Sequence, residues 1–195
     1  MKIILASTSP YRRELLARLT DLFSTCRPEV DEALLPGEEP AARALRLAAA
    51  KAQAVAADHP DSLVIGSDQV AWRPTSEGFE IFRKPGSAAR AIDQLMTMRG
   101  KSVFFHTAVC LLNTSTGHTQ RDHVTTEVRF RDLSEAEITR YVAREKPVDC
   151  AGAAKVESLG ISLLEYVRDD DPTALIGLPL IKLSAMLRQA GVSVP

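Results

Sequence analysis

Two arginines stand where a helix is predicted to begin, which is an unusual place for cations. Residues 7–13 read Ser-Thr-Ser-Pro-Tyr-Arg-Arg. A helix N-terminus carries a partial positive charge and favours anions. Arg12 and Arg13 therefore fit there if a phosphate chain occupies the position and accepts charge-assisted hydrogen bonds, with hydroxyls such as that of Ser7 beside them. A solvated basic face would explain the same residues without a ligand, and spacing alone does not separate the two interpretations.

A second candidate is the segment Gly66-Ser67-Asp68-Gln69, which follows the short apolar run 63–65. That run predicts a buried strand, and ligands of open α/β sheets bind at the carboxyl ends of strands. There, the Asp68 carboxylate could take a proton from water or hold a divalent cation. An aspartate that bonds its own backbone in a turn is the alternative.

Acidic residues and isolated lysines form a third group. Glu29, Asp31 and Glu32 lie in a predicted acidic loop, Lys51 lies among alanines, and Lys84 precedes Pro-Gly. Mg²⁺ in proteins uses one or two carboxylates together with substrate oxygens, so this set indicates a magnesium-dependent phosphoryl site. Taken singly, each residue also fits an ordinary surface charge.

Other chemistries find little support. The four histidines show neither metal-ligand spacing nor a serine or cysteine partner, and there is no GxxxxGK[ST] or GxGxxG segment. Three scattered cysteines make neither a disulfide framework nor a zinc site and suit a reducing cytoplasm. A net charge of -1 argues against a stable nucleic-acid partner, and the short apolar start is neither a signal peptide nor a membrane span.

The elements that must position these residues alternate between strand and helix, which favours an α/β fold with a mixed sheet. Strands are predicted over 1–6, 63–65, 103–112, 123–130 and 159–167, and a hairpin over 72–83. Helices are predicted from Pro10, over 40–57 and 88–98, from Ser134 to Arg144, and over 179–189. The chain has 195 residues with 45% hydrophobic and 25% charged, so we expect one domain over 1–195, built as two lobes that share one sheet.

The assembled pattern resembles the Maf family of nucleoside triphosphate pyrophosphatases along nearly the whole chain. The opening segment Leu5-Ala6-Ser7-x-Ser9-Pro10-x-Arg12-Arg13 is similar to the family's opening signature. The likeness continues in order through Pro28-Glu29-Val30-Asp31-Glu32, Lys51-Ala52, Gly66-Ser67-Asp68-Gln69, Lys84-Pro85, Cys150-Ala151-Gly152 and Ile176-Gly177-Leu178-Pro179. Each motif is short, but together they are specific.

The resemblance implies a two-lobed α/β fold around a long curved mixed sheet, with a nucleotide cleft between the lobes. It implies cleavage between the α- and β-phosphates with a divalent cation, Mg²⁺ or Mn²⁺. Asp68 matches the family's proton acceptor, and Glu32 with Asp68 would hold the metal. The phosphate-handling positions correspond to Ser7, Arg12, Arg13, Lys51 and Lys84. The same resemblance implies a cytoplasmic enzyme that forms a homodimer.

The match also indicates a branch of the family. Pyrimidine-specific members carry Asp-Thr where this chain has Asp68-Gln69, so the chain resembles the branch that acts on 7-methyl-GTP. The base-recognition positions of that branch correspond to Tyr11, Gln69 and Glu157, although Trp is common at the first. The same reaction on dTTP, UTP or another non-canonical nucleotide is one alternative. A non-catalytic nucleotide-binding regulator of septum formation is another.

Overall fold

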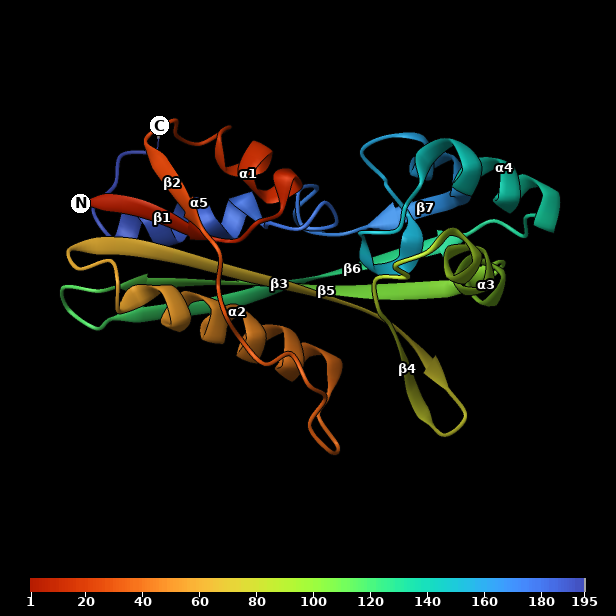
Figure 1. Cartoon of the computed structure of the whole chain (residues 1–195), viewed down its shortest axis with the longest axis horizontal. Coiled ribbons are helices and arrows are strands. Elements are labelled where there is room, and N and C mark those ends of the chain that lie inside the picture. Colours follow the sequence, from red (N-terminus) through yellow and green to blue (C-terminus); the bar gives the residue numbers. More distant parts are fainter. Residues whose placement is uncertain (195) are drawn as a thin grey trace. The chain divides into compact units, whose positions relative to one another are not determined.

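The computed structural model describes residues 1–194 and divides them into two compact units (Figure 1). Unit 1 comprises residues 1–69, 106–124 and 171–194, and unit 2 comprises 70–105 and 125–170. Three long strands contribute residues to both units. That the chain acts as one domain stays a prediction.

Seven strands form one mixed sheet, which confirms the predicted α/β class. Their order is β2-β1-β3-β5-β6-β7, with β4 paired to β3. Strand β1 runs parallel to β2 and β3, whereas β3–β4 and β6–β7 are antiparallel. The strands are β1 (Lys2–Ala6), β2 (Phe23–Cys26), β3 (Ser62–Thr75), β4 (Gly78–Phe82), β5 (Ser102–Asn113), β6 (Thr119–Phe130) and β7 (Leu164–Arg168). The α-helices are α1 (Pro10–Leu16), α2 (Pro40–Ala56), α3 (Ala88–Met98), α4 (Glu135–Glu145) and α5 (Leu180–Gln189).

In unit 1, helices cover both faces of the sheet, and Figure 1 shows α2 and α5 on opposite sides of β3. Successive strand residues point to opposite faces. Alternate residues of β1 and β3, such as Leu5 and Ile65, pack with apolar residues of α1 and α5. This core includes Ile3, Leu15, Leu16, Leu63, Leu111, Leu178, Leu183 and Leu187.

The other face of β3 lies directly against α2. A Cβ on Gly66 would stand 2.7 Å from the backbone nitrogen of Ala52 and would also collide with the carbonyl of Ala48. Glycine at this position therefore allows the strand and the helix to approach closely. That approach brings the middle of α2 next to the residues that follow Gly66.

Unit 2 carries α3, α4, β4 and β7. Ser87 caps α3, and Ser134 with Glu137 forms the predicted capping box of α4. Gly152 has φ +73°, and a Cβ there would stand 2.9 Å from the ring of Phe105. Glycine at 152 thus satisfies both a left-handed backbone and a tight contact.

Two predictions about elements are wrong, and one strand was missed. The predicted short strand 63–65 is the start of β3, which continues to Thr75, so Gly66–Gln69 lie within a strand. Residues 159–163 form a 3₁₀ helix before β7 begins at Leu164, because this segment has no partner strand until that point. The short strand β2, half exposed and only four residues long, was not predicted.

Within residues 1–194, the structure contains no helix with the length and apolar character needed to cross a membrane.

Candidate functional site

The site in unit 1 begins where β1 stops and β3 continues. Ala6, the last residue of β1, pairs with Gly66 of β3. The next residues of β3, Ser67 and Asp68, therefore lie beyond the end of their neighbour at the sheet's carboxyl edge. The prediction of a strand end was correct for β1 and wrong for β3, yet it placed Asp68 at the edge where ligands of such sheets bind.

Lys51 joins the two predicted acidic residues. Its Nζ lies 2.6 Å from Oδ1 of Asp68 and 2.8 Å from Oε1 of Glu32. The Lys51 and Asp68 side chains are each only 10% exposed, whereas that of Glu32 is 55% exposed. Asp68 shares the face of β3 with Gly66, so it points toward α2 and meets Lys51 there.

Arg12 is a second cation near the carboxylates of Asp68 and Glu32. Its Nε donates to the carbonyl of Gly177 at 2.8 Å. Burial lowers the pKa of the Arg12 guanidinium from its ordinary value, and the negative charges of Asp68 and Glu32 act in the opposite direction. The structure thus gathers two cations and two carboxylates at one edge of the sheet.

Ser67 and Gln69 occupy the opposite face of β3 from Asp68. The Ser67 hydroxyl donates to the carbonyl of Gly177 at 2.9 Å, so this carbonyl accepts from Ser67 and Arg12 together. Nε2 of Gln69 lies 3.0–3.1 Å from Thr107 Oγ1 and from the carbonyls of Ala174 and Leu175. The amide nitrogen has two N–H groups, and three protein acceptors already lie within hydrogen-bond distance of it. Any contact of Gln69 with a ligand would therefore use Oε1, an acceptor.

The predicted helix-start cluster also lies in unit 1. Ser9 caps α1 by accepting from the backbone of Arg12, and Pro10 is the first helical residue. Ser7 is buried, and its Oγ accepts from the backbone of Ser9 at 3.1 Å. Arg13 is exposed and Tyr11 half-buried. The end of β1 and the first turn of α1 therefore supply the predicted phosphate-binding residues in unit 1 other than Lys51.

Sequence reasoning missed the residues that hold the acidic loop. Arg43 of α2 donates to the carbonyls of Glu32 and Ala33 at 2.6 and 3.1 Å. Arg46, one turn later, forms an ion pair with Glu38. Two arginines three residues apart on a helix that follows an acidic loop were a signal for this arrangement, because such residues lie on one face.

The remaining two predicted site residues belong to unit 2. Lys84 is exposed in the segment between β4 and α3. Glu157 is exposed between the two short 3₁₀ helices, and reduced hydration raises its pKa, with Asp149 and Glu145 adding to the shift and Lys155 opposing it.

Glu32 and Asp68 are the carboxylates of unit 1 that could take part in holding a divalent cation. Both lie against the ammonium group of Lys51, so they are close to one another. Among the described residues 1–194 no three His, Cys, Asp or Glu side chains gather as a metal site. Two carboxylates completed by phosphate oxygens would match the way Mg²⁺ is usually held.

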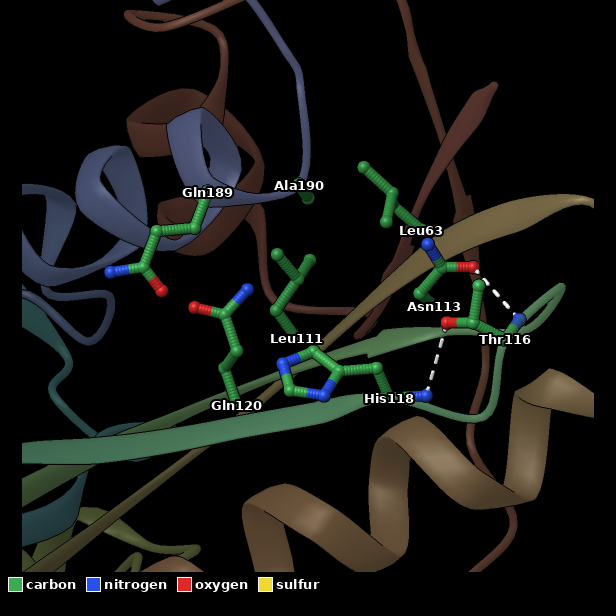
Figure 2. Close-up of a pocket in the computed structure, with 8 residues that line it drawn as sticks. All are labelled: Leu63, Leu111, Asn113, Thr116, His118, Gln120, Gln189 and Ala190. Atoms are coloured by element: carbon green, nitrogen blue, oxygen red, sulfur yellow. Dashed lines mark hydrogen bonds between the residues drawn. The ribbon is translucent and has the colours of Figure 1, made fainter.

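A separate pocket in unit 1 has a volume of about 360 Å³ (Figure 2). The residues that line it carry amide, hydroxyl and imidazole groups but include no Lys or Arg that could bind a triphosphate. Leu63 at its wall precedes Asp68 by five residues, roughly 16 Å along an extended strand. The lining residues are Leu63, Leu111, Asn113, Thr116, His118, Gln120, Gln189 and Ala190.

Comparison with known proteins shows which family this chain is similar to. A family model described as "Maf-like protein" matches residues 2–190. A protein of Aromatoleum aromaticum named 7-methyl-GTP pyrophosphatase is 57% identical over 194 residues, covering 100% of this chain and 98% of its own length. One of Cupriavidus metallidurans with the same name is 56% identical, covering 97% and 93%. The solved structure of a HAM1 protein from Coxiella burnetii has a TM-score of 0.54 at 16% identity, over 97% and 99% of the two chains, which supports the fold alone.

Proposed function

We propose that this chain, which belongs to the family of Maf-like proteins, is a nucleoside triphosphate pyrophosphatase that hydrolyses 7-methyl-GTP to 7-methyl-GMP and pyrophosphate. Relatives at 56–57% identity over nearly the whole chain carry the name of that activity. The observation that carries the proposal is the cluster at the end of β1, where Arg12, Lys51, Glu32 and Asp68 come together. Modified nucleotides cleaved in this way cannot enter nucleic acids.

In this proposal Asp68 is the general base. Its Oδ1 is held by Lys51, which fixes the carboxylate and leaves Oδ2 to take a proton from water. The water oxygen forms a new bond to phosphorus, the phosphoanhydride P–O bond breaks, and pyrophosphate departs with the electron pair. No side chain becomes covalently attached to the substrate.

The phosphate chain would be held at the end of β1 and the first turn of α1. The Nε of Arg12 is bonded to Gly177, so its two Nη atoms would face phosphate oxygens as a planar fork. Arg13 and the hydroxyl of Ser7 would add further donors, and Lys84 of unit 2 is proposed as another phosphate ligand. Of the two arginines, Arg12 has its direction fixed by a hydrogen bond, the one to the carbonyl of Gly177.

Glu32 and Asp68 would hold the divalent cation, Mg²⁺ or Mn²⁺. When bound, the cation neutralises charge on the phosphate oxygens. Lys51 would then keep the two carboxylates at the same place and partly offset their mutual repulsion.

Base choice would rest on Tyr11, Gln69 and Glu157. A 7-methylated guanine is cationic, so an aromatic face and a nearby carboxylate favour it. The same reaction on dTTP or UTP is the second candidate, and Gln69 disfavours it because pyrimidine-specific members of the family carry Thr there. Action in the cytoplasm, a homodimer and a regulatory role in septum formation stay predictions.

The decisive test measures pyrophosphate release from 7-methyl-GTP, GTP, dTTP and UTP with Mg²⁺ or Mn²⁺. We expect turnover to be fastest with 7-methyl-GTP. Asp68→Asn should lower kcat by roughly 10²–10⁴, the usual contribution of a positioned base. Asp58→Asn removes the same charge from an exposed position of unit 1 and should leave kcat unchanged.

Two outcomes would contradict the proposal. Absence of turnover with every nucleotide would favour the non-catalytic binding protein. Turnover near that of the unmodified chain in a folded Asp68→Asn variant would remove Asp68 from the role of base.

A further inference from the structure

A buried carboxylate outside the predicted site organises the segment that precedes α5. Asp171 is only 1% exposed. Its Oδ1 accepts from the backbone nitrogen of Thr173 at 3.0 Å and from the Thr173 hydroxyl at 2.6 Å. Its Oδ2 accepts from the backbone nitrogen of Ile181 at 2.7 Å. A buried charge needs such a set of partners to be tolerated.

These bonds tie the start of α5 to the preceding turn. Pro179, at the N-cap of α5, supplies no side-chain cap. Thr173 Oγ1 instead accepts from the backbone nitrogen of Leu180 at 2.9 Å, and Asp171 accepts from Ile181. A negative charge at this end of the helix is also favoured by the helix dipole. The turn 172–178 is therefore closed at both ends by two side chains.

The carbonyls of this closed turn are the acceptors that hold the site. The carbonyl of Gly177 accepts from Arg12 and Ser67. The carbonyls of Ala174 and Leu175 accept from Gln69. The guanidinium and the amide can point only where these carbonyls allow, because a side-chain hydrogen bond fixes both distance and direction.

We propose that Asp171 and Thr173 are positioning residues, which fix the turn 172–178 so that its carbonyls aim Arg12 at the phosphate chain and hold Gln69 in place. The inference rests on the proposed function in that Arg12 is taken to bind phosphate. Neither Asp171 nor Thr173 touches the substrate in this arrangement; both act through backbone carbonyls.

Four variants test the proposal. Asp171→Asn keeps the shape but loses the charge and one acceptor. Thr173→Val removes the hydroxyl at constant shape, and Thr173→Ser restores it. Ser134→Ala is the matched control, because it removes a comparable helix cap from α4 of unit 2.

The first readout is the affinity for inorganic triphosphate with Mg²⁺, measured by calorimetry, which needs no turnover. We expect Asp171→Asn and Thr173→Val to weaken it roughly fivefold or more, and Thr173→Ser to retain it. With 7-methyl-GTP, we expect KM to rise by a similar factor, with a smaller change in kcat. Ser134→Ala should lower the melting temperature without changing the affinity.

The second readout is a double-mutant cycle with Arg12→Lys, which keeps the charge and removes the Nε bond to Gly177. If Asp171 acts through Arg12, its substitution should have little further effect on affinity in that background. An additive cycle would overturn the proposal, as would an unchanged affinity in Asp171→Asn. Should Asp171→Asn fail to fold, the pair Thr173→Val and Thr173→Ser decides, and equal affinities in the two would also overturn it.

These results are distinguishable from failure of the proposed function. A chain that binds inorganic triphosphate but cleaves no nucleotide would refute the enzymatic activity, while the affinity measurements would still test the positioning residues.

Discussion

At the scale of single residues, Lys51 is the group on which the charges of the site depend. It is the shared partner of Asp68 and Glu32, and it lies on the buried face of α2, next to Ala52. Removing one member of a buried ion pair leaves the other uncompensated, and this usually costs more than the pair itself contributes. Lys51 is therefore expected to matter for folding as well as for catalysis.

We predict that Lys51→Met lowers the free energy of unfolding by about 3 kcal/mol, measured by denaturant unfolding without substrate. The loss comes from leaving the largely buried carboxylate of Asp68 without its cation. In the double variant Lys51→Met with Asp68→Asn, part of the stability should return, because the uncompensated charge is gone. Equal stability of the single and double variants would show that the pair is too well hydrated to matter.

Base choice is also decided by single residues. We predict that Glu157→Ala lowers kcat/KM for 7-methyl-GTP by roughly ten- to a hundredfold, since the guanine N–H groups lose a charged acceptor and the cationic base loses a nearby carboxylate. GTP, which has the N–H groups but not the positive charge, should be affected less, and dTTP least. Glu77→Ala, which removes an exposed acid from the turn after β3, serves as the control. An equal loss on all three nucleotides would make Glu157 a structural residue.

At the scale of elements, β3 distributes the site by simple alternation. Gly66 and Asp68 face α2, whereas Ser67 and Gln69 face the turn before α5. One strand thus presents the proposed base to Lys51 and two hydrogen-bond donors to backbone carbonyls. Because β1 ends at Ala6, the same stretch lies at an edge of the sheet.

The contact between β3 and α2 gives a prediction for Gly66. We expect Gly66→Ala to lower the free energy of unfolding by about 1–3 kcal/mol, because the new methyl group meets helix backbone that must shift. The shift should also move Lys51, next to Ala52 on α2, and so lower kcat. Denaturant unfolding and pyrophosphate release measure the two effects. A variant as stable and active as the unmodified chain would contradict the close approach.

Local sequence signals predicted most elements for physical reasons that can be named. Ser9-Pro10, Ser87 and the pair Ser134 with Glu137 marked three helix starts correctly, because caps act within one turn. The length of β3 could not be read, since Gly66 and Pro74 interrupt its pattern and its first half pairs with β1, far away in the sequence.

Some residues of the candidate site could likewise be predicted from local sequence, and others could not. Arg12, Lys51 and Asp68 were found by residue type and motif. The carbonyl of Gly177 and the carboxylate of Asp171 were not found, since their contacts join residues more than 100 positions apart or depend on backbone direction.

At the scale of the whole molecule, a buried histidine links folding to pH. His106 is 9% exposed, and its ring lies 5.4 Å from that of His123. Burial first, and the charge of His123 second, lower the pKa of His106 from 6.5 to about 4. Between these values the unfolded chain binds a proton that the folded chain does not, so acid favours unfolding in this window.

We therefore predict that the free energy of unfolding falls as the pH drops from about 6.5 to about 4, by at most about 1.4 kcal/mol for each pH unit from this group. The contribution is fully present above pH 6.5 and lost by the time the folded-state pKa is passed. Below that, carboxylates such as Glu38, whose pKa its bond with Arg46 lowers, add their own loss. Denaturant unfolding at several pH values measures the slope. His106→Gln should flatten it between pH 4 and 6.5, while His118→Gln at an exposed position should not. An unchanged slope in His106→Gln would mean that His106 takes up its proton in the folded state as readily as in the unfolded chain.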